Sequence, residues 1–310
     1  MINNLIAFLM IIICGVFFQW KKPAGVDPDK ARHAINTIVI KFFMPALCFK
    51  VIATMEINSD VILFPLSAIL TVLSVMFFSY LTYTILGKFT KVSKKEKGAA
   101  ILTSSFGNVT FFGIPILTAL YGSEAIKFPI LYDCMGTAIL LWTIGIMLGA
   151  YYGSGRKVRL KDGIKSFAMT PPIWGMVLGY IANFSGFGQQ MPEFFIAFLD
   201  LMSAPIIGIM IFSIGMMLKI PQMKSLFIAI PAVIIKLCIS PLIAFLFATL
   251  LGLEGLAFKS TIVDAAMPVM ALSLAIVSES KLDETAAALI AVITVILSFI
   301  TIPITVLLIG

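Results

Sequence analysis

Charged side chains are scarce in this sequence. Asp, Glu, Lys and Arg make up 12% of its 310 residues, against about 25% in an ordinary soluble domain, and hydrophobic residues make up 60%. The mean hydropathy is accordingly high, at +1.09. With so few charges the chain could not cover a water-exposed surface. Soluble enzymes and binding domains are therefore excluded, and an integral membrane protein is expected.

Residues and motifs that carry catalysis are equally scarce. The sequence has one histidine and four cysteines, and each cysteine lies inside an apolar run without CxxC spacing, as a small buried side chain would. There is no HExxH motif, phosphate-binding glycine loop or aspartate cluster, which excludes a metalloprotease, an ATP-driven pump and a prenyl transferase. We expect no catalytic residue, no metal ion and no cofactor.

Long apolar runs take the place of these features. The first run is expected to span the membrane and not to be a signal peptide, because Lys21 and Lys22 follow it and no cleavage site ends it. The fold class expected is an all-α polytopic membrane protein with ten transmembrane helices in one domain, residues 1–310. The spans are expected at about 3–20, 32–55, 60–87, 98–121, 128–152, 170–185, 193–218, 225–251, 256–278 and 285–309.

The basic residues between the runs predict the orientation. Seventeen of them fall on one side of the membrane, and only Lys127 and Lys259 fall on the other. By the positive-inside rule the larger group is cytoplasmic, so both termini of this cell-membrane protein should face outward. The net charge of +7 therefore does not predict nucleic-acid binding. The larger group is Lys21, Lys22, Lys30, Arg32, Lys88, Lys91, Lys94, Lys95, Lys97, Arg156, Lys157, Arg159, Lys161, Lys165, Lys219, Lys224 and Lys281.

The two halves of the chain share their helix-breaking residues. This pattern predicts a duplicated five-span unit, with one repeat at about 1–152 and the other at about 168–310. Because five is odd, the second copy is inverted in the membrane, as in many secondary transporters. The matched positions are Met44-Pro45 and Ala204-Pro205, 160 residues apart; Pro115 and Pro268, 153 apart; and Asn108 and Asp264, 156 apart.

The uncharged run at 98–123 carries the clearest sign of function. Asn108 and Thr110 put polar groups in its middle, and Gly113 and Pro115 are expected to break its helix. A break leaves backbone N–H and C=O groups free at membrane depth, which is tolerated only against protein or a watery cavity. We expect these four residues to bind substrate.

Span nine has a matching interruption at Ala266 and Pro268. At 1.5 Å per residue, Asn108 lies about 15 Å from the cytoplasmic start of span four and Pro268 about 18 Å from the outer start of span nine. Both breaks should therefore meet near the midplane. Asp264 precedes the second break and is the candidate proton carrier, because burial opposes ionisation of a carboxyl; a structural pair with Lys236 is the alternative.

Lysines inside the spans are candidates for attracting an anion. Lys236 lies about 18 Å into span eight, too deep to reach the surface easily. We expect it to attract an anionic substrate or to pair with Asp200, Asp264 or a helix C-terminus. Lys41 is the second candidate for the substrate site, whereas Lys50 should extend to the membrane surface.

Other polar groups have two interpretations each. Asn108 can both donate and accept hydrogen bonds, so it could bind a carboxylate or cap the broken helix. Asp133 and Asp200 lie a turn or two below the outer surface, where local pairing or a place at a helix N-terminus is expected. The glycine stripe of Gly145, Gly149 and Gly153 is expected to serve helix packing.

Several stretches resemble a known family in the order in which they occur. The run SFGNVTFFGIPILTALYG, residues 105–122, is similar to the fourth-helix signature of the auxin efflux carrier family of permeases. Stretches at 204–218, 234–246, 264–279 and 298–304 resemble its seventh to tenth helices. The resemblance implies a ten-helix inverted repeat with a scaffold and a transport domain, in which broken helices four and nine cross and small organic anions bind beside the crossing.

The crossing motif indicates which branch of the family is nearer. Plant members, which export auxin, carry an Asn-Pro-Asn-Thr-Tyr-like motif there, and bacterial members include permeases for malonate and other carboxylates. This chain has Asn108-Val109-Thr110 at the first break and Ala266-Met267-Pro268 at the second. The resemblance therefore implies the bacterial type.

The function expected is a secondary transporter that moves a small organic anion, a carboxylate, by alternating access. Its partners would be the anion, the lipid bilayer and a coupling proton or sodium ion; the transport direction and oligomeric state, a homodimer included, stay open. A sodium-coupled symporter of the bile-acid type shares the architecture but needs more sodium ligands than Asn108, Thr110 and Asp264. An intramembrane aspartyl protease would match Tyr132-Asp133 but lacks its GxGD partner.

Overall fold

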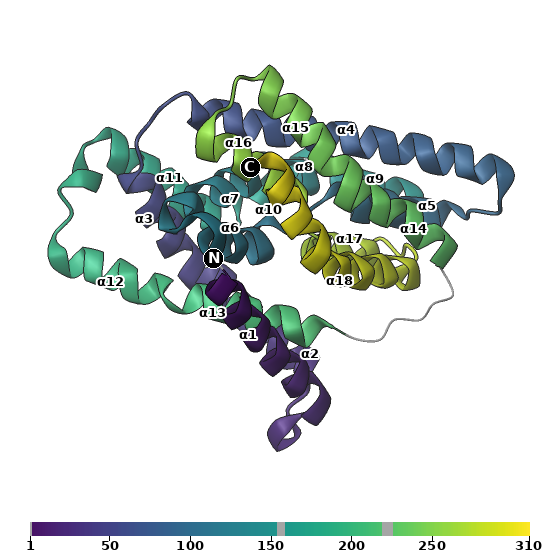
Figure 1. Cartoon of the computed structure of the whole chain (residues 1–310), viewed down its shortest axis with the longest axis horizontal. Helices are drawn as coiled ribbons and strands as arrows, with labels where there is room; N and C mark the ends of the chain where they lie inside the picture. Colours follow the sequence, from purple (N-terminus) through teal and green to yellow (C-terminus); the bar gives the residue numbers. More distant parts are fainter. Residues whose placement is uncertain (1, 154–158, 219–225) are drawn as a thin grey trace. The chain divides into compact units, whose positions relative to one another are not determined.

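The protein is described by a computed structural model that covers residues 2–153, 159–218 and 226–310 (Figure 1). These residues are helical almost throughout, which confirms the all-α fold class. Within them, six helical stretches are long and apolar enough to cross a membrane. Those stretches are Pro28–Thr54, Asp60–Phe89, Ser123–Tyr152, Glu193–Met217, Leu226–Leu250 and Glu284–Ile309.

The other four expected spans correspond to shorter helices. Helix α1 (Ile2–Lys21) and helix α11 (Pro171–Phe184) match the first and sixth spans. The fourth and ninth are each divided in two: α5 (Lys94–Ser105) precedes α6 (Ile114–Tyr121), and α16 (Gly255–Ala265) precedes α17 (Ala271–Glu279). Of the basic residues used to predict orientation, Arg156, Lys157, Lys219 and Lys224 lie outside the described residues.

The chain forms two compact units, and each draws on both halves of the sequence. The first comprises Met1–Asn58, Ile114–Ile130 and Phe167–Lys219, and the second comprises Ser59–Gly113, Leu131–Ser166 and Ile220–Gly310. The helices of the first unit include α1, α6 and α11, with α2 (Pro28–Ile38), η2 (Val39–Phe43), α3 (Met44–Thr54), α12 (Glu193–Ser203) and α13 (Pro205–Met217). Those of the second include α4 (Asp60–Phe89), η3 (Val109–Gly113), η5 (Asp133–Thr137), α9 (Ile146–Tyr152), α14 (Leu226–Ile234), η9 (Ile235–Ile239), α15 (Ser240–Leu250) and α18 (Glu284–Ile309), with α5, α16 and α17.

Glycines bring the helices of the first unit into close contact. Helices α1 and α13 meet at Gly15 and Gly215, where a Cβ on Gly15 would lie 2.2 Å from the carbonyl oxygen of Phe212. Helices α3 and α11 meet at Gly175, where a Cβ would lie 2.2 Å from the Pro45 carbonyl oxygen. Small residues give this close approach inside membranes, where van der Waals contact replaces the hydrophobic effect between helices.

The second unit uses glycine in the same way. A Cβ on Gly149 of α9 would lie 2.6 Å from the Ser280 hydroxyl, and one on Gly145 would lie 3.3 Å from Leu141 and 3.4 Å from Phe106. The expected packing role of this glycine stripe is therefore confirmed. Helix α4 packs against α5 and α15, and α15 packs against α16.

Three prolines follow a widened helical turn. The π-helical segments η2, η3 and η9 end at Phe43, Gly113 and Ile239, and in each case proline is the second residue after the segment. Proline has no N–H to donate and its ring clashes with the carbonyl four residues earlier, so a wider turn before it relieves the conflict. These prolines therefore lie within continuous helical stretches.

Candidate polar site at the paired helix breaks

The two helix breaks lie side by side in the second unit. The Asn108 N–H donates to the Pro268 carbonyl at 2.7 Å, and the Met270 N–H donates to the Phe106 carbonyl at 2.9 Å. Between these bonds, Gly107 and Val269 form an antiparallel bridge. The backbone groups released by each break are thus satisfied by the other, as membrane depth demands. The expected meeting of the two breaks is seen in these hydrogen bonds.

The first break lies upstream of the predicted position. Gly113 and Pro115 were expected to interrupt the helix, but the extended residues are Phe106 to Asn108, and η3 runs directly into α6. The wide turn of η3 accommodates the proline, so it causes no break. Gly113 is buried at the end of η3 in the second unit, whereas Pro115 belongs to the first unit.

Asn108 begins the helix that follows the first break. Its side-chain Oδ1 accepts a hydrogen bond from the Phe111 N–H at 3.2 Å, and its carbonyl accepts one from the Phe112 N–H at 3.1 Å. The side chain is almost fully buried, with 4% of the residue exposed. Of the two interpretations of Asn108, the cap is the one seen in the structure.

Lys236 reaches the end of the other broken helix. Its Nζ donates to the Ala265 carbonyl at 2.9 Å and lies 3.3 Å from the Ser240 hydroxyl, which itself donates to the same carbonyl at 2.9 Å. Ala265 is the last residue of α16, so Lys236 pairs with a helix C-terminus, one of its three predicted partners. Ala266, fully buried, ends α16 by donating its N–H to the Ile262 and Val263 carbonyls.

Asp264 is fully buried beside this contact. Neither carboxylate oxygen has a hydrogen-bond partner among the described residues, although the carboxylate interacts electrostatically with Lys236 and Asp133. The predicted direct ion pair of Lys236 with Asp264 is not formed in the described part of the chain, where Lys236 turns to the Ala265 carbonyl instead. A buried carboxyl without a donor is costly, so Asp264 is a candidate for a role beyond packing.

Asp133 is a member of this site that the sequence did not predict. The Thr110 hydroxyl donates to its Oδ2, and Oδ1 has no partner among the described residues. The local pairing expected for Asp133 is found in this bond to Thr110, and the residue is buried, with 9% exposed. Buried charged side chains in the described residues are Asp133, Lys236 and Asp264, and all three belong to the second unit.

Lys41, Lys50 and Asp200 lie in the first unit. Lys50 pairs with Asp200, which confirms local pairing for that aspartate; both side chains are partly exposed. Lys41 lines an apolar cavity of about 570 Å³ between η2, α3, α11 and α12, with Trp174 and Phe195 among its walls.

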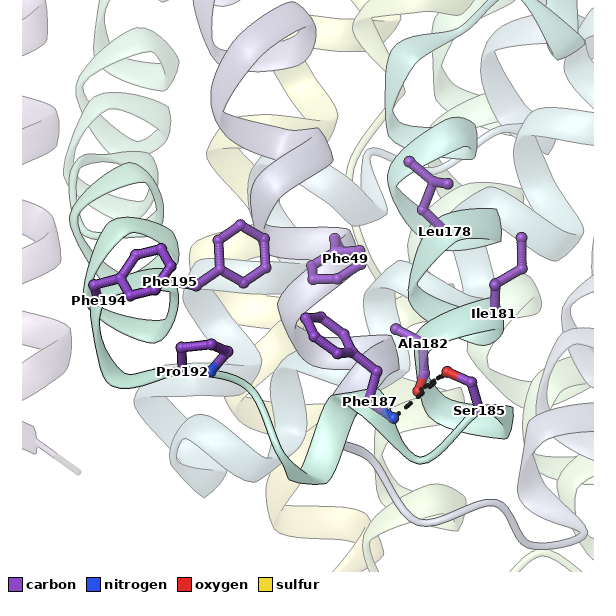
Figure 2. Close-up of a pocket in the computed structure, with 9 residues that line it drawn as sticks. All are labelled: Phe49, Leu178, Ile181, Ala182, Ser185, Phe187, Pro192, Phe194 and Phe195. Carbon is purple, nitrogen blue, oxygen red and sulfur yellow. Dashed lines mark hydrogen bonds between the residues drawn. The ribbon is translucent and has the colours of Figure 1, made fainter.

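A neighbouring cavity in the same unit is almost wholly apolar. It has a volume of about 470 Å³, and Figure 2 shows Phe49 of α3 and Phe195 of α12 on one side and Leu178 and Ile181 of α11 on the other. The polar group in its wall is Ser185, whose hydroxyl donates to the Ala182 carbonyl at 3.1 Å. Such a lining cannot recognise a charged substrate, so the polar site in the second unit is the stronger candidate.

Comparison with known proteins identifies the family of the chain. A family model described as membrane transport protein matches residues 1–306. The chain is 28% identical over 278 residues to an uncharacterized transporter of Methanocaldococcus jannaschii, covering 89% of this chain and 88% of the relative. It is 25% identical over 307 residues to an uncharacterized transporter of Methanothermobacter thermautotrophicus, covering 97% and 96%. The chain therefore belongs to the membrane transport protein family, that of the auxin efflux carriers, and is a multi-pass membrane transporter and not an enzyme.

Proposed function

We propose that this transporter moves a small organic anion, a carboxylate, across the cell membrane by alternating access. The observation that carries the proposal is the cluster of buried polar side chains around the paired breaks. Asn108 and Lys236 supply N–H donors for an anion, Thr110 donates to Asp133, and Asp264 supplies a group that can change its charge. A broken-helix site at membrane depth is the arrangement that secondary transporters use.

The charges of the cluster favour coupling to protons. With Asp133, Lys236 and Asp264 all ionised, the site has a net negative charge and repels an anion. Binding a proton at one carboxyl removes this repulsion, so anion and proton each favour binding of the other. Asp264 is the better candidate, because Thr110 donates to Asp133 whereas Asp264 has no donor among the described residues.

The bounds of the helices support a ten-span inverted repeat as the transport fold. An offset of 160 residues carries α5 (Lys94–Ser105) onto α16 (Gly255–Ala265) almost residue for residue, and it carries Pro45 onto Pro205. The same offset carries the first break, residues 106–108, onto 266–268. The predicted offsets of 153 and 156 are thus replaced by one value, and Asn108 then corresponds to Pro268 and not to Asp264.

Uptake by purified protein in proteoliposomes tests the proposal. Mono- and dicarboxylates are offered as radiolabelled substrates under an inward pH gradient, an inward sodium gradient, or neither. We expect at least one carboxylate to accumulate under the pH gradient alone. Accumulation only under the sodium gradient would favour the bile-acid-type symporter, and failure of every carboxylate to accumulate under either gradient would contradict the anion proposal.

A further inference from the structure

The ammonium of Lys236 lies against the oxygen atoms of Ala265 and Ser240, which are called the oxygen cage below. Its Nζ lies 2.9 Å from the Ala265 carbonyl oxygen and 3.3 Å from the Ser240 hydroxyl oxygen, and the residue is 2% exposed. The carboxylate of Asp264, with two unpartnered oxygens among the described residues, adds a negative charge nearby. Carbonyl, hydroxyl and carboxylate oxygens are also the ligands that a hard metal cation prefers.

The position of the ammonium matches the electrostatics of the break. The carbonyl groups at the end of α16 carry the negative end of the helix dipole, and the Ala265 carbonyl accepts from both Lys236 and Ser240. The ammonium also lies against the first break, because a Cβ on Gly107 would be 3.0 Å from Nζ and 3.2 Å from Cε. One buried ammonium therefore lies next to both broken segments.

The other half of the chain packs the equivalent helices without charge. Under the 160-residue offset Asp264 corresponds to Ser104 of α5, and Lys236 corresponds to a position on α4 one turn before Ser79. Ser79 and Ser104 share a hydrogen bond of 2.7 Å between their hydroxyl oxygens, and both are fully buried. Two hydroxyls are enough for this helix contact, so packing does not explain the lysine and aspartate of the second half.

From these contacts we infer that Lys236 is a built-in cation, which takes the place of a bound sodium ion at the end of α16 and makes transport independent of sodium. The inference rests on the proposed transport function, and it says which group offsets the negative charge of the transport site. Removal of the ammonium leaves the Ala265 and Ser240 oxygens without their cation, beside the carboxylate of Asp264, and a small cation could then bind there.

Two variants of Lys236 separate the charge from the space that the side chain fills. Lys236→Ala removes the ammonium and opens the oxygen cage, whereas Lys236→Met removes the charge but fills most of the space with an apolar chain. Each purified protein is heated in NaCl, LiCl or choline chloride at the same ionic strength. A cation that binds the folded state raises the apparent unfolding temperature by mass action.

We expect Lys236→Ala to gain about 3 °C or more in NaCl or LiCl over choline chloride, saturating with concentration, and Lys236→Met and the wild-type protein to show no such gain. Adding Asp264→Asn to Lys236→Ala should abolish the gain. An absence of any sodium response in folded Lys236→Ala would overturn the inference. So would a saturable sodium response in the wild-type protein, which needs no variant to fold. Because these readouts need no substrate, they stay valid if the carboxylate proposal fails.

Discussion

At the scale of single residues, Asp264 combines full burial with a carboxylate that accepts no hydrogen bond from the described residues. The groups that interact with it electrostatically are Lys236, Asp133 and Tyr132. A carboxyl between a cation and a second carboxyl changes its proton affinity when either neighbour moves. The proposed alternating access would supply such a movement, and proton binding at Asp264 would then follow the transport cycle.

Asp264→Asn tests this role, because the amide resembles the protonated carboxyl but cannot lose a proton. We expect the variant to lose uphill accumulation driven by a pH gradient, since no charge change remains to couple. Exchange of labelled for unlabelled substrate should persist in part. Both are measured in proteoliposomes with a substrate that the wild-type protein accumulates.

Asp200→Asn is the matched control for that experiment. Its carboxylate pairs with Lys50 at a partly exposed position of the first unit, so the same chemical change should leave accumulation near the wild-type level. Full pH-driven accumulation by Asp264→Asn would exclude the proton-carrier role.

At the scale of helices, the close contact of α1 and α13 depends on two glycines. A Cβ on Gly215 would lie 2.1 Å from the Ile12 carbonyl oxygen and 2.9 Å from the Gly15 Cα. Both neighbours are backbone atoms, so they cannot turn aside as a flexible side chain would. A methyl group at this point can be accepted only if the two helices separate.

Gly215→Ala should therefore lower the free energy of unfolding by about 1–3 kcal/mol, the usual cost of overpacking. Gly208, on the same helix, is the control, because a Cβ there would have no neighbour within 4 Å. Gly208→Ala should be neutral or stabilising by up to about 1 kcal/mol, since alanine is the better helix former. Thermal unfolding in detergent compares the two, and equal stabilities would show that the contact does not limit stability.

The sequence predicts those helices whose bounds are set by the length of an apolar run. Long apolar runs gave the bounds of Asp60–Phe89 and Glu284–Ile309 to within two residues, because a membrane span needs little beyond length and composition. The break in span four was misplaced, because Pro115 is visible in a sequence whereas the wide turn that accommodates it is not. The true break, at Phe106–Asn108, is stabilised by hydrogen bonds to residues some 160 positions away.

The residues of the candidate site also divide into those that the sequence could predict and those that it could not. Asn108, Lys236 and Asp264 could be found from sequence, since a polar residue inside an apolar run needs a reason. Asp133 stands in such a run too, but its role depends on the Thr110 hydroxyl 23 residues earlier, and only the fold brings the two together. Nothing in the sequence singles out Ser240 as a member of the site, because serine is common in membrane helices.

At the scale of the whole molecule, orientation in the membrane follows from charge. Lys91 belongs to the basic group and is exposed after α4, and Ser123 is exposed after α6. The positive-inside rule puts Lys91 in the cytoplasm and Ser123 outside, with both termini also outside. An inverted repeat of two five-span units requires both termini on the same face, because an odd number of spans per unit returns the chain to the opposite face.

Single cysteines at Lys91 and Ser123 test this topology in intact cells. The four native cysteines are first replaced by alanine, since Cys14 and Cys238 are exposed and Cys48 and Cys134 are buried. We expect an impermeant thiol reagent to label Ser123→Cys and to spare Lys91→Cys until the cells are opened. The opposite pattern would put the termini in the cytoplasm, whereas labelling of both sites from outside would mean that no single span separates them. The first result would contradict the predicted orientation, and the second would contradict the span count on which the inverted repeat rests.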